Sequence, residues 1–214
     1  HRAAWFMCHR IRFMMADKRP TRLKGTLEAD ETYVGGKLRG HKLHRAQKMK
    51  MSEIQTKAME KKTPVFGVIE RGGRVRAQVM PHVNRDNVER ALFYAIDRQN
   101  ARIMTDEHLI YRNLERMLPH DVIRHESEYV RGEVHTQGIE SFWAILKRGL
   151  VGTYHHVDAG YLAQYVNEYE FRHNTRQISD AERFRALASQ TEGRVDWYLS
   201  KQTSEPVRPD SLND

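Results

Sequence analysis

Three acidic side chains, far apart in the sequence, stand at positions from which they could act together on a phosphate. Asp30 lies inside an apolar stretch of strand type, Asp106 directly follows a second such stretch, and Glu140 lies in the first turn of a predicted helix. Magnesium prefers oxygen ligands, and two ions about 3.5–4 Å apart need carboxylates that converge from separate elements. The middle of a strand, the end of a strand and the start of a helix can deliver that convergence, so the pattern is compatible with a two-metal site.

Each carboxylate also has an ordinary structural interpretation. Asp106 could cap the element that follows it, and Glu140 could be a favourable acid in a first helical turn. Asp30 is harder to explain in this way, because an acid within an apolar strand costs several kcal/mol unless it is paired or binds a metal.

Basic side chains accompany the third acid. Lys147 follows Glu140 by seven residues, which is two helical turns on one face, and Arg148 is next to it. A lysine beside a cluster of metal-binding carboxylates would hold a substrate phosphate as a point charge, whereas the alternative is a surface lysine without a role. Ile145, on the opposite side of this helix, is predicted to belong to the core.

The elements that would carry these residues follow the order of a mixed α/β sheet. Strands are predicted over 26–34, 64–70, 75–81, 101–105 and 122–123, with a hairpin turn at 71–74. Helices are predicted over 5–14, 84–96, 111–118, 139–148 (stopped by Gly149), 158–174 and from the capping box Ser179–Glu182 onward. Three strands followed by alternating strands and helices indicate a mixed sheet with helices on its faces. Ribonuclease-H-like sheets have this order, as do other mixed α/β folds.

The positive charge is concentrated in the first third of the chain. The 214 residues carry a formal net charge of +8, but residues 1–62 hold 16 Lys and Arg against 6 Asp and Glu. The segment 37–62 alone contributes 9 basic and 2 acidic side chains. This segment is either a solvated loop or a surface that contacts a phosphate backbone and releases its counterions.

Composition excludes several classes of protein. The single cysteine, Cys8, rules out an internal disulfide framework and a multi-cysteine zinc site within the chain. The apolar runs are too short for a transmembrane helix, and no secretory leader opens the sequence, so we expect a cytoplasmic protein without a membrane partner.

Several segments together resemble the IS1595-type (ISXO2-like) insertion-sequence transposases. The segments are ADETYVGGK (29–37), PVFGVIERGG (64–73), TDE (105–107), EYVRGEVHTQGIESFWAILKRGLVGTYHHV (128–157) and EFRHN (170–174). The resemblance extends over residues 1 to about 195, and the block around IESFWAILKRGLVGTYHH is long and specific. It implies a ribonuclease-H-like α/β fold with a mixed sheet flanked by helices, and a DDE-type activity that cleaves transposon ends and transfers them into target DNA.

The resemblance also implies roles for particular residues. Asp30 and Asp106 match the first two catalytic acids, which would hold two Mg²⁺ ions, replaceable by Mn²⁺, and Lys147 matches the lysine that follows the third. Members of the family usually have Asn where this chain has Gln137. Gln137 and Glu140 are therefore both candidates for the third metal ligand. We favour Glu140, because a carboxylate binds magnesium better than an amide does.

DNA is the partner that the resemblance implies, as terminal inverted repeats and as target. The side chains expected to contact it are Lys147, Arg148, Lys37, Arg39, Lys42, Arg45 and Lys48. His135, one of several loop histidines without a metal-binding spacing, could touch DNA but is not ranked as catalytic. Trp143 and Tyr154 could stack on unpaired bases or pack within the protein. A homo-oligomer on paired ends and a nucleoid-associated, prokaryotic location are further expectations.

The expected division of the chain follows from the same comparison. Residues 1–24 would be a helical remnant of an N-terminal DNA-binding region, residues 25–195 the catalytic domain with the basic insertion 37–62 and C-terminal helices, and residues 196–214 a polar tail. Two alternatives to an active transposase stay open. One is a catalytically impaired DNA-binding remnant, and the other is a nuclease of the same fold that cleaves without joining.

Overall fold

The computed structural model describes residues 2–18, 20–35, 62–123 and 135–190. Five of the residues expected to contact DNA fall outside the described residues, as does the polar tail; they are Lys37, Arg39, Lys42, Arg45 and Lys48. The acids, Gln137, His135, Lys147 and Arg148 are all described.

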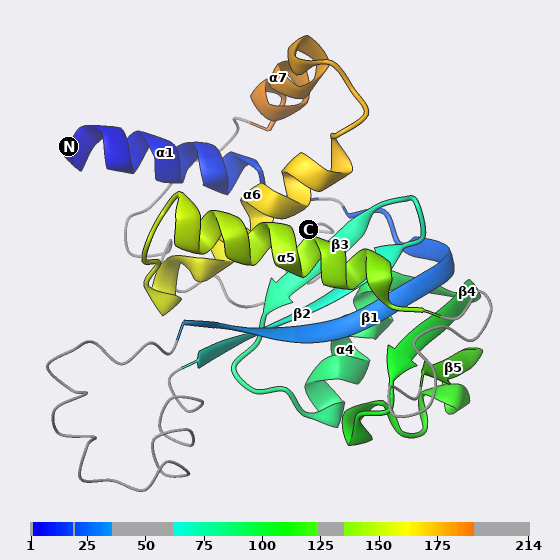
Figure 1. The fold of residues 1–214 in the computed structure, drawn as a ribbon. Coiled ribbons are helices and arrows are strands. Elements are labelled where there is room, and N and C mark those ends of the chain that lie inside the picture. The colour runs from blue at the N-terminus through cyan, green and yellow to red at the C-terminus, as the bar shows by residue number, and fades with distance from the viewer. Residues whose placement is uncertain (1, 19, 36–61, 124–134, 191–214) are drawn as a thin grey trace, which may run out of the picture.

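A five-stranded mixed sheet forms the centre of the described chain (Figure 1). Its strands are β1 (Leu23–Gly35), β2 (Lys62–Glu70), β3 (Val75–Val79), β4 (Ile96–Asp106) and β5 (His120–Ile123). Their order across the sheet is β3-β2-β1-β4-β5, in which β2 runs antiparallel to its neighbours β1 and β3, and β4 and β5 run parallel to β1. This is the ribonuclease-H-like arrangement, and it confirms the expected fold class.

Helices cover both faces of this sheet. They are α1 (Arg2–Met14), α4 (Arg85–Ala95), α5 (Gln137–Gly152), α6 (Leu162–Asn174) and α7 (Asp180–Ala188). In Figure 1, α4 lies on one side of the sheet, α5 crosses the other, and α1 and α7 lie farther out beside α6. Among the described residues, no helix is long and apolar enough to span a membrane.

Alternation along β1 divides the core into two halves. Leu27 and Ala29 point into the half that α4 covers, where they join Val88 and Leu92. On β2, Val65 belongs to the other half, together with apolar residues of α5 and α6. Because the side-chain period of a strand is two, Glu28 and Asp30 point to the α5 side.

Side chains of α6 complete the edge strand β3. The amide of Asn174 accepts a hydrogen bond from the backbone N–H of Val75 and donates one to its carbonyl, at 2.8 and 3.0 Å. Glu170 accepts from the backbone N–H of Ala77 at 3.0 Å and pairs with Arg76 at 2.5 Å. Both residues belong to the EFRHN segment of the resemblance, so that motif has a clear structural role here.

Most predicted elements are confirmed, including the Asn84 cap of α4 and the Ser179–Glu182 capping box of α7. The helix predicted over 111–118 is wrong, because this segment forms two 3₁₀ turns. Asn113, between the turns, has φ 72°, a left-handed conformation that an α-helix cannot accommodate. The helix predicted to reach Ile96 ends one residue earlier, since Ile96 begins β4.

Two predictions on α5 are also wrong. The helix does not stop at Gly149 but continues to Gly152. A Cβ at Gly149 would lie 1.4 Å from the Tyr169 hydroxyl, so this glycine permits the close approach of α6. Ile145 is 52% exposed and does not belong to the core, because it lies on the outward face of α5.

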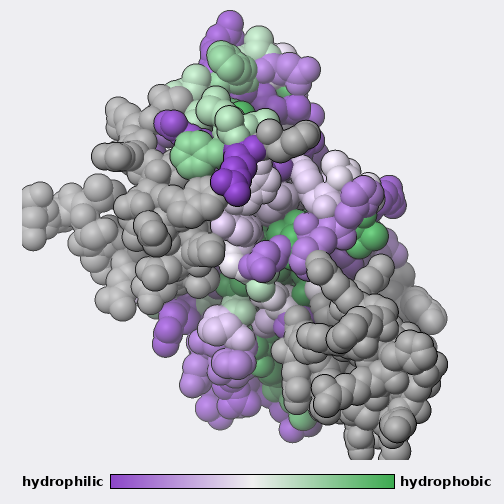
Figure 2. All heavy atoms as spheres, turned by 90° about the vertical axis from the view of Figure 1, so that its left-hand side faces the viewer, coloured by the Kyte–Doolittle hydropathy of each residue, from purple (hydrophilic) through white to green (hydrophobic). Residues whose placement is uncertain are grey.

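Apolar side chains also remain exposed on the outer helices. Trp5, Met7 and Ile11 on α1 and Phe184 on α7 are between 37% and 70% exposed. On the face shown in Figure 2, the hydrophobic residues of the described chain lie interspersed among hydrophilic ones.

Candidate active site

The register of two parallel strands sets Asp30 beside Asp106. The paired register ends with Glu28 of β1 level with Met104 of β4, and Asp30 and Asp106 each lie two residues beyond this pair. Neighbouring strands lie about 4.8 Å apart, and residues two apart share a face. The first two predicted acids are therefore adjacent and point to the side of the sheet that α5 covers.

A glycine opposite Asp30 lets α5 approach this face. Gly67 of β2 pairs with Asp30, and a Cβ at Gly67 would lie 2.6 Å from the ring of Trp143. Trp143 is 4% exposed, so it packs in the core and does not offer a stacking surface for a base. The ring therefore packs α5 against β2 at the residue that pairs with Asp30.

Glu140 projects from the first turn of α5 at the same site. Its Oε1 accepts a hydrogen bond from the hydroxyl of Thr136 at 2.8 Å, which restrains the carboxylate at the helix start. Gln137 is exposed three residues earlier, a spacing that places it on the same side of the helix.

Asp30 shows that the three carboxylates interact. Burial first of all, and then the negative charges of Glu31, Asp106 and Glu140, raise its pKa to about 7, against the opposing effect of the hydrogen bond from the Glu31 backbone N–H. Like charges that disfavour ionisation in this way are relieved by a bound cation. In the described parts of the chain, however, no three His, Cys, Asp or Glu side chains already converge as a set of metal ligands.

Two further residues beside Asp30 were not predicted from the sequence. The hydroxyl of the buried Tyr111 donates a hydrogen bond to the carboxylate of Glu31. Burial raises the pKa of Tyr111, and the charges of Glu31, Asp30 and Asp106 add to this effect. Tyr111 therefore stays protonated and fixes Glu31 next to the cluster. The sequence gives no sign of this contact, because Tyr111 lies 81 residues after Asp30 and belongs to no motif with it.

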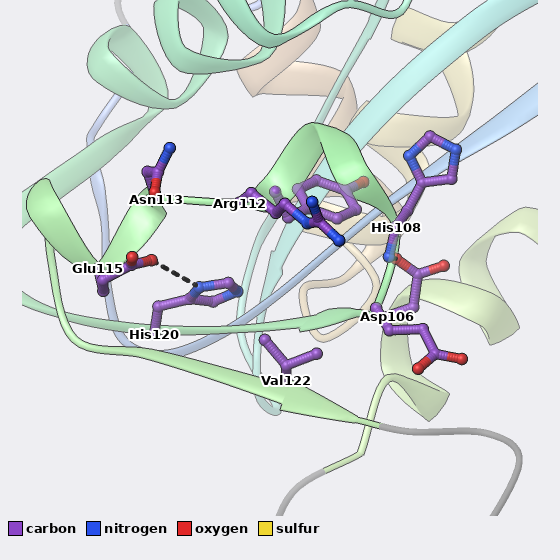
Figure 3. A pocket seen from close by; sticks show the side chains of 9 residues that line it. Asp106, His108, Arg112, Asn113, Glu115, His120 and Val122 are labelled. Carbon is purple, nitrogen blue, oxygen red and sulfur yellow. Dashed lines mark hydrogen bonds and ion pairs between the residues drawn. The ribbon is translucent and has the colours of Figure 1, made fainter.

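A cavity of about 420 Å³ opens next to Asp106 (Figure 3). Its lining includes Asp106, Glu107, His108, Tyr111, Arg112, Asn113, Glu115, His120 and Val122. Asp106 accepts a hydrogen bond from the backbone N–H of His108 at 3.1 Å, and His108 is the N-cap of the 3₁₀ turn that follows. His120 is held by Thr105 at 2.8 Å and lies 3.9 Å from Glu115. Arg112 is exposed and has no side-chain partner among the described residues.

The predicted basic residues near the acids have different surroundings. Lys147 and Arg148 are exposed further along α5 and form no ion pair with a described residue. His135 is half-buried, with its Nδ1 3.3 Å from Oε1 of Glu28, and it lines a second cavity of about 790 Å³ with Lys24 and Arg71. Tyr154 packs in the protein, where its hydroxyl donates to Glu168.

A protein-family model matches most of this chain. A family model described as the ISXO2-like transposase domain matches residues 22–174. A solved simian T-cell lymphotropic virus intasome in complex with the PP2A regulatory subunit B56 gamma contains a chain with 14% sequence identity and a TM-score of 0.39. The match covers 81% of the present chain and 50% of the matched chain, so the present chain spans about half of that length. Among curated proteins, no relative matches the sequence.

Proposed function

The chain belongs to the ISXO2-like transposase domain family, and from that premise we propose that it cleaves the ends of a DNA element and joins them to target DNA. The observation that carries this proposal is the register that sets Asp30 beside Asp106, together with the charge of Glu140 acting on Asp30. Three carboxylates from two strands and a helix supply the oxygen donors that hard divalent cations require.

The residues fit a pair of divalent cations. Carboxylate is the ligand type that Mg²⁺ and Mn²⁺ prefer, and burial together with the charges of Glu31, Asp106 and Glu140 raises the pKa of Asp30, an effect that a bound cation would offset. Asp30 and Asp106 would hold one ion, and Asp30 and Glu140 the other. When bound, such ions activate the attacking oxygen and stabilise the leaving oxygen of a phosphodiester.

Side chains around the acids would bind and orient the DNA. Lys147 and Arg148 are exposed cations on the helix that carries Glu140, where they would hold the scissile or a neighbouring phosphate. Arg112 would contact the backbone on the other side, at the cavity beside Asp106. The segment 37–62 would add contacts that depend on charge and not on base sequence.

Strand transfer in vitro tests this proposal. Purified chain is incubated with Mn²⁺ and a duplex that carries the end of its own element, nicked in advance so that only joining is required. We expect joined products that disappear in Asp30→Ala and Asp106→Ala. Asp97→Ala is the matched control, because Asp97 lies at the opposite end of the strand that carries Asp106.

Other outcomes assign the alternatives. Cleavage without joining would indicate a nuclease, and DNA binding without either reaction would indicate an impaired remnant. Joined products that persist in both alanine variants would contradict the assigned acids.

A further inference from the structure

Glu28 is a buried carboxylate close to the candidate active site but outside its acids. It lies two residues before Asp30 on the same face of β1, and its exposed fraction is 0%. Its Oε2 accepts hydrogen bonds from the backbone N–H groups of Gly138 and Ile139, at 2.7 and 3.1 Å. These two N–H groups belong to the first turn of α5, so Glu28 joins the strand of Asp30 to the helix of Glu140.

The contact suits the start of a helix. The first N–H groups of a helix have no partner within it, and a negative charge there is stabilised by the helix dipole. A Cβ at Gly138 would lie 2.8 Å from Oε2 of Glu28, so glycine at this position lets the carboxylate reach both N–H groups. A larger residue at this position would crowd the Glu28 carboxylate where it accepts these two hydrogen bonds.

Arg71 and His135 complete the arrangement around the same carboxylate. Nε of Arg71 donates to Oε1 of Glu28 at 3.2 Å, and Nδ1 of His135 lies 3.3 Å from the same oxygen. A second nitrogen of Arg71 donates to the His135 carbonyl at 3.2 Å and approaches Sδ of Met104 at 3.1 Å. Glu28 therefore ties together β1, the turn after β2, and the segment that leads into α5, beside β4.

Stability alone is a poor explanation for this carboxylate. Removing an ion pair from water has a desolvation penalty that often equals or exceeds its attraction, so an apolar side chain would serve packing as well. The carboxylate instead lies where the distance between two strands and one helix decides how the catalytic acids face one another. A displacement of about 1 Å in such a set is enough to impair catalysis.

We infer that Glu28 is a positioning residue, which holds the first turn of α5 so that Glu140 faces Asp30 and Asp106. This inference rests on the proposed function, because it gives Glu28 a role in orienting that site. Glu28 has no exposed surface from which it could touch DNA, and it reaches α5 through the backbone N–H groups of Gly138 and Ile139.

Glu28→Gln is the primary test, and Glu170→Gln is its matched control. Glu170 is also buried, pairs with an arginine and accepts a backbone N–H, but at the far edge of the sheet. In Glu28→Gln we expect faster hydrogen exchange at Gly138 and Ile139 and about tenfold weaker binding of Mn²⁺ alone, measured by electron paramagnetic resonance of free Mn²⁺. The kcat of joining should fall with an unchanged KM for DNA.

The control and a second variant keep the inference open to contradiction. Glu170→Gln should lower the unfolding temperature without changing Mn²⁺ affinity. Gly138→Ala should weaken Mn²⁺ binding, although alanine favours a helix by about 1 kcal/mol over glycine. This variant provides the test if Glu28→Gln does not fold. Unchanged Mn²⁺ affinity in folded Glu28→Gln or in Gly138→Ala, or an equal loss in Glu170→Gln, would overturn the inference.

Failure of the proposed function would be visible separately. A wild-type chain that binds Mn²⁺ but neither cleaves nor joins DNA would refute the transposase proposal. The hydrogen-exchange and Mn²⁺ measurements would still decide whether Glu28 positions the acids.

Discussion

Asp30 occupies a strand position where a neutral side chain would be more stable. Its carboxylate is partly buried and repelled by Glu31, Asp106 and Glu140, and these effects raise its pKa to about 7. Local destabilisation of this kind is common where a site is built for chemistry, since the groups that a reaction needs are seldom the ones that folding prefers.

Because the pKa of Asp30 is raised, replacing this acid by a neutral residue should stabilise the folded chain by an amount that depends on pH. The folded chain keeps its proton up to about pH 7 whereas the unfolded chain releases it near 3.8, so ionisation of Asp30 lowers stability as pH rises between these values. The slope is up to about 1.4 kcal/mol per pH unit. Asp30→Asn should therefore gain stability over wild type from pH 4 to pH 7 and keep a constant difference above.

Urea unfolding at several pH values, in EDTA, measures this difference. Asp97→Asn is the control, because hydrogen bonds to Asn100 lower the pKa of Asp97 and its ionisation favours the folded state. A difference between Asp30→Asn and wild type that does not vary with pH would show that Asp30 ionises normally.

The third ligand can be assigned by comparing Glu140 with Gln137. Both side chains leave the same face of α5, but only Glu140 supplies a charge that acts on Asp30. We expect Glu140→Ala to lower the joining rate at least 100-fold, in the range that an essential catalytic group contributes, and Gln137→Ala to have a small effect. Single-turnover joining assays measure both rates. Full activity in Glu140→Ala with loss in Gln137→Ala would reverse the assignment.

The proposed catalytic acids stand out in the sequence, whereas the side chains that surround them do not. Asp30 and Asp106 stand out because an acid in or directly after an apolar strand is unusual. Glu28 has the same property but was overlooked, because its partners Arg71 and Gly138 come from distant segments. Tyr111 and its bond to Glu31 likewise depend on tertiary contact.

At the scale of elements, hydrophobic periodicity predicted the strands and most helices, while close contacts decided the exceptions. The 3₁₀ turns between β4 and β5 replace a helix because Asn113 adopts a left-handed conformation. Gly149 was interpreted as a helix stop, although its function is to admit Tyr169. The sequence pattern of one segment does not show which residues of a distant segment pack against it.

Gly149 and Gly152 form a matched pair that tests this explanation. A Cβ at Gly149 would meet the Tyr169 hydroxyl at 1.4 Å, whereas a Cβ at Gly152 would meet nothing within 4 Å. Gly149→Ala should destabilise the chain by about 1–3 kcal/mol through overpacking, and Gly152→Ala should be neutral or stabilise it by up to about 1 kcal/mol. Chemical denaturation measures both. A stabilised Gly149→Ala would mean that α5 and α6 do not pack as closely as described.

At the scale of the whole molecule, α1 is joined to the catalytic sheet through α6 and by polar contacts. Arg12 donates to Glu168 at 2.7 Å, both residues are buried, and the guanidinium lies over the ring of Tyr165 at 4.2 Å. His9 bonds to Gln164 on the same helix. Several exposed apolar residues of α1 therefore remain outside this interface.

Loss of Arg12 should release α1 without unfolding the sheet. Arg12→Ala removes one charge-assisted hydrogen bond to the buried Glu168, which is worth about 1.5–3 kcal/mol, while Glu168 keeps its contact with Arg172. We expect faster hydrogen exchange throughout α1 and unchanged exchange in β1 and β4. Arg10→Ala, an exposed position on the same helix, is the control. Equal protection of α1 in wild type and Arg12→Ala would show that apolar packing alone holds this helix.

The location of bound cations tests most directly whether the carboxylates form one site. Crystals of the chain with Mn²⁺ and a nicked end duplex would give an anomalous difference map that locates the ions. We expect two peaks, about 3.5–4 Å apart, between Asp30, Asp106 and Glu140. Peaks at other side chains would contradict the proposed catalytic site. So would the absence of peaks at these three acids in a mixture that yields joined DNA.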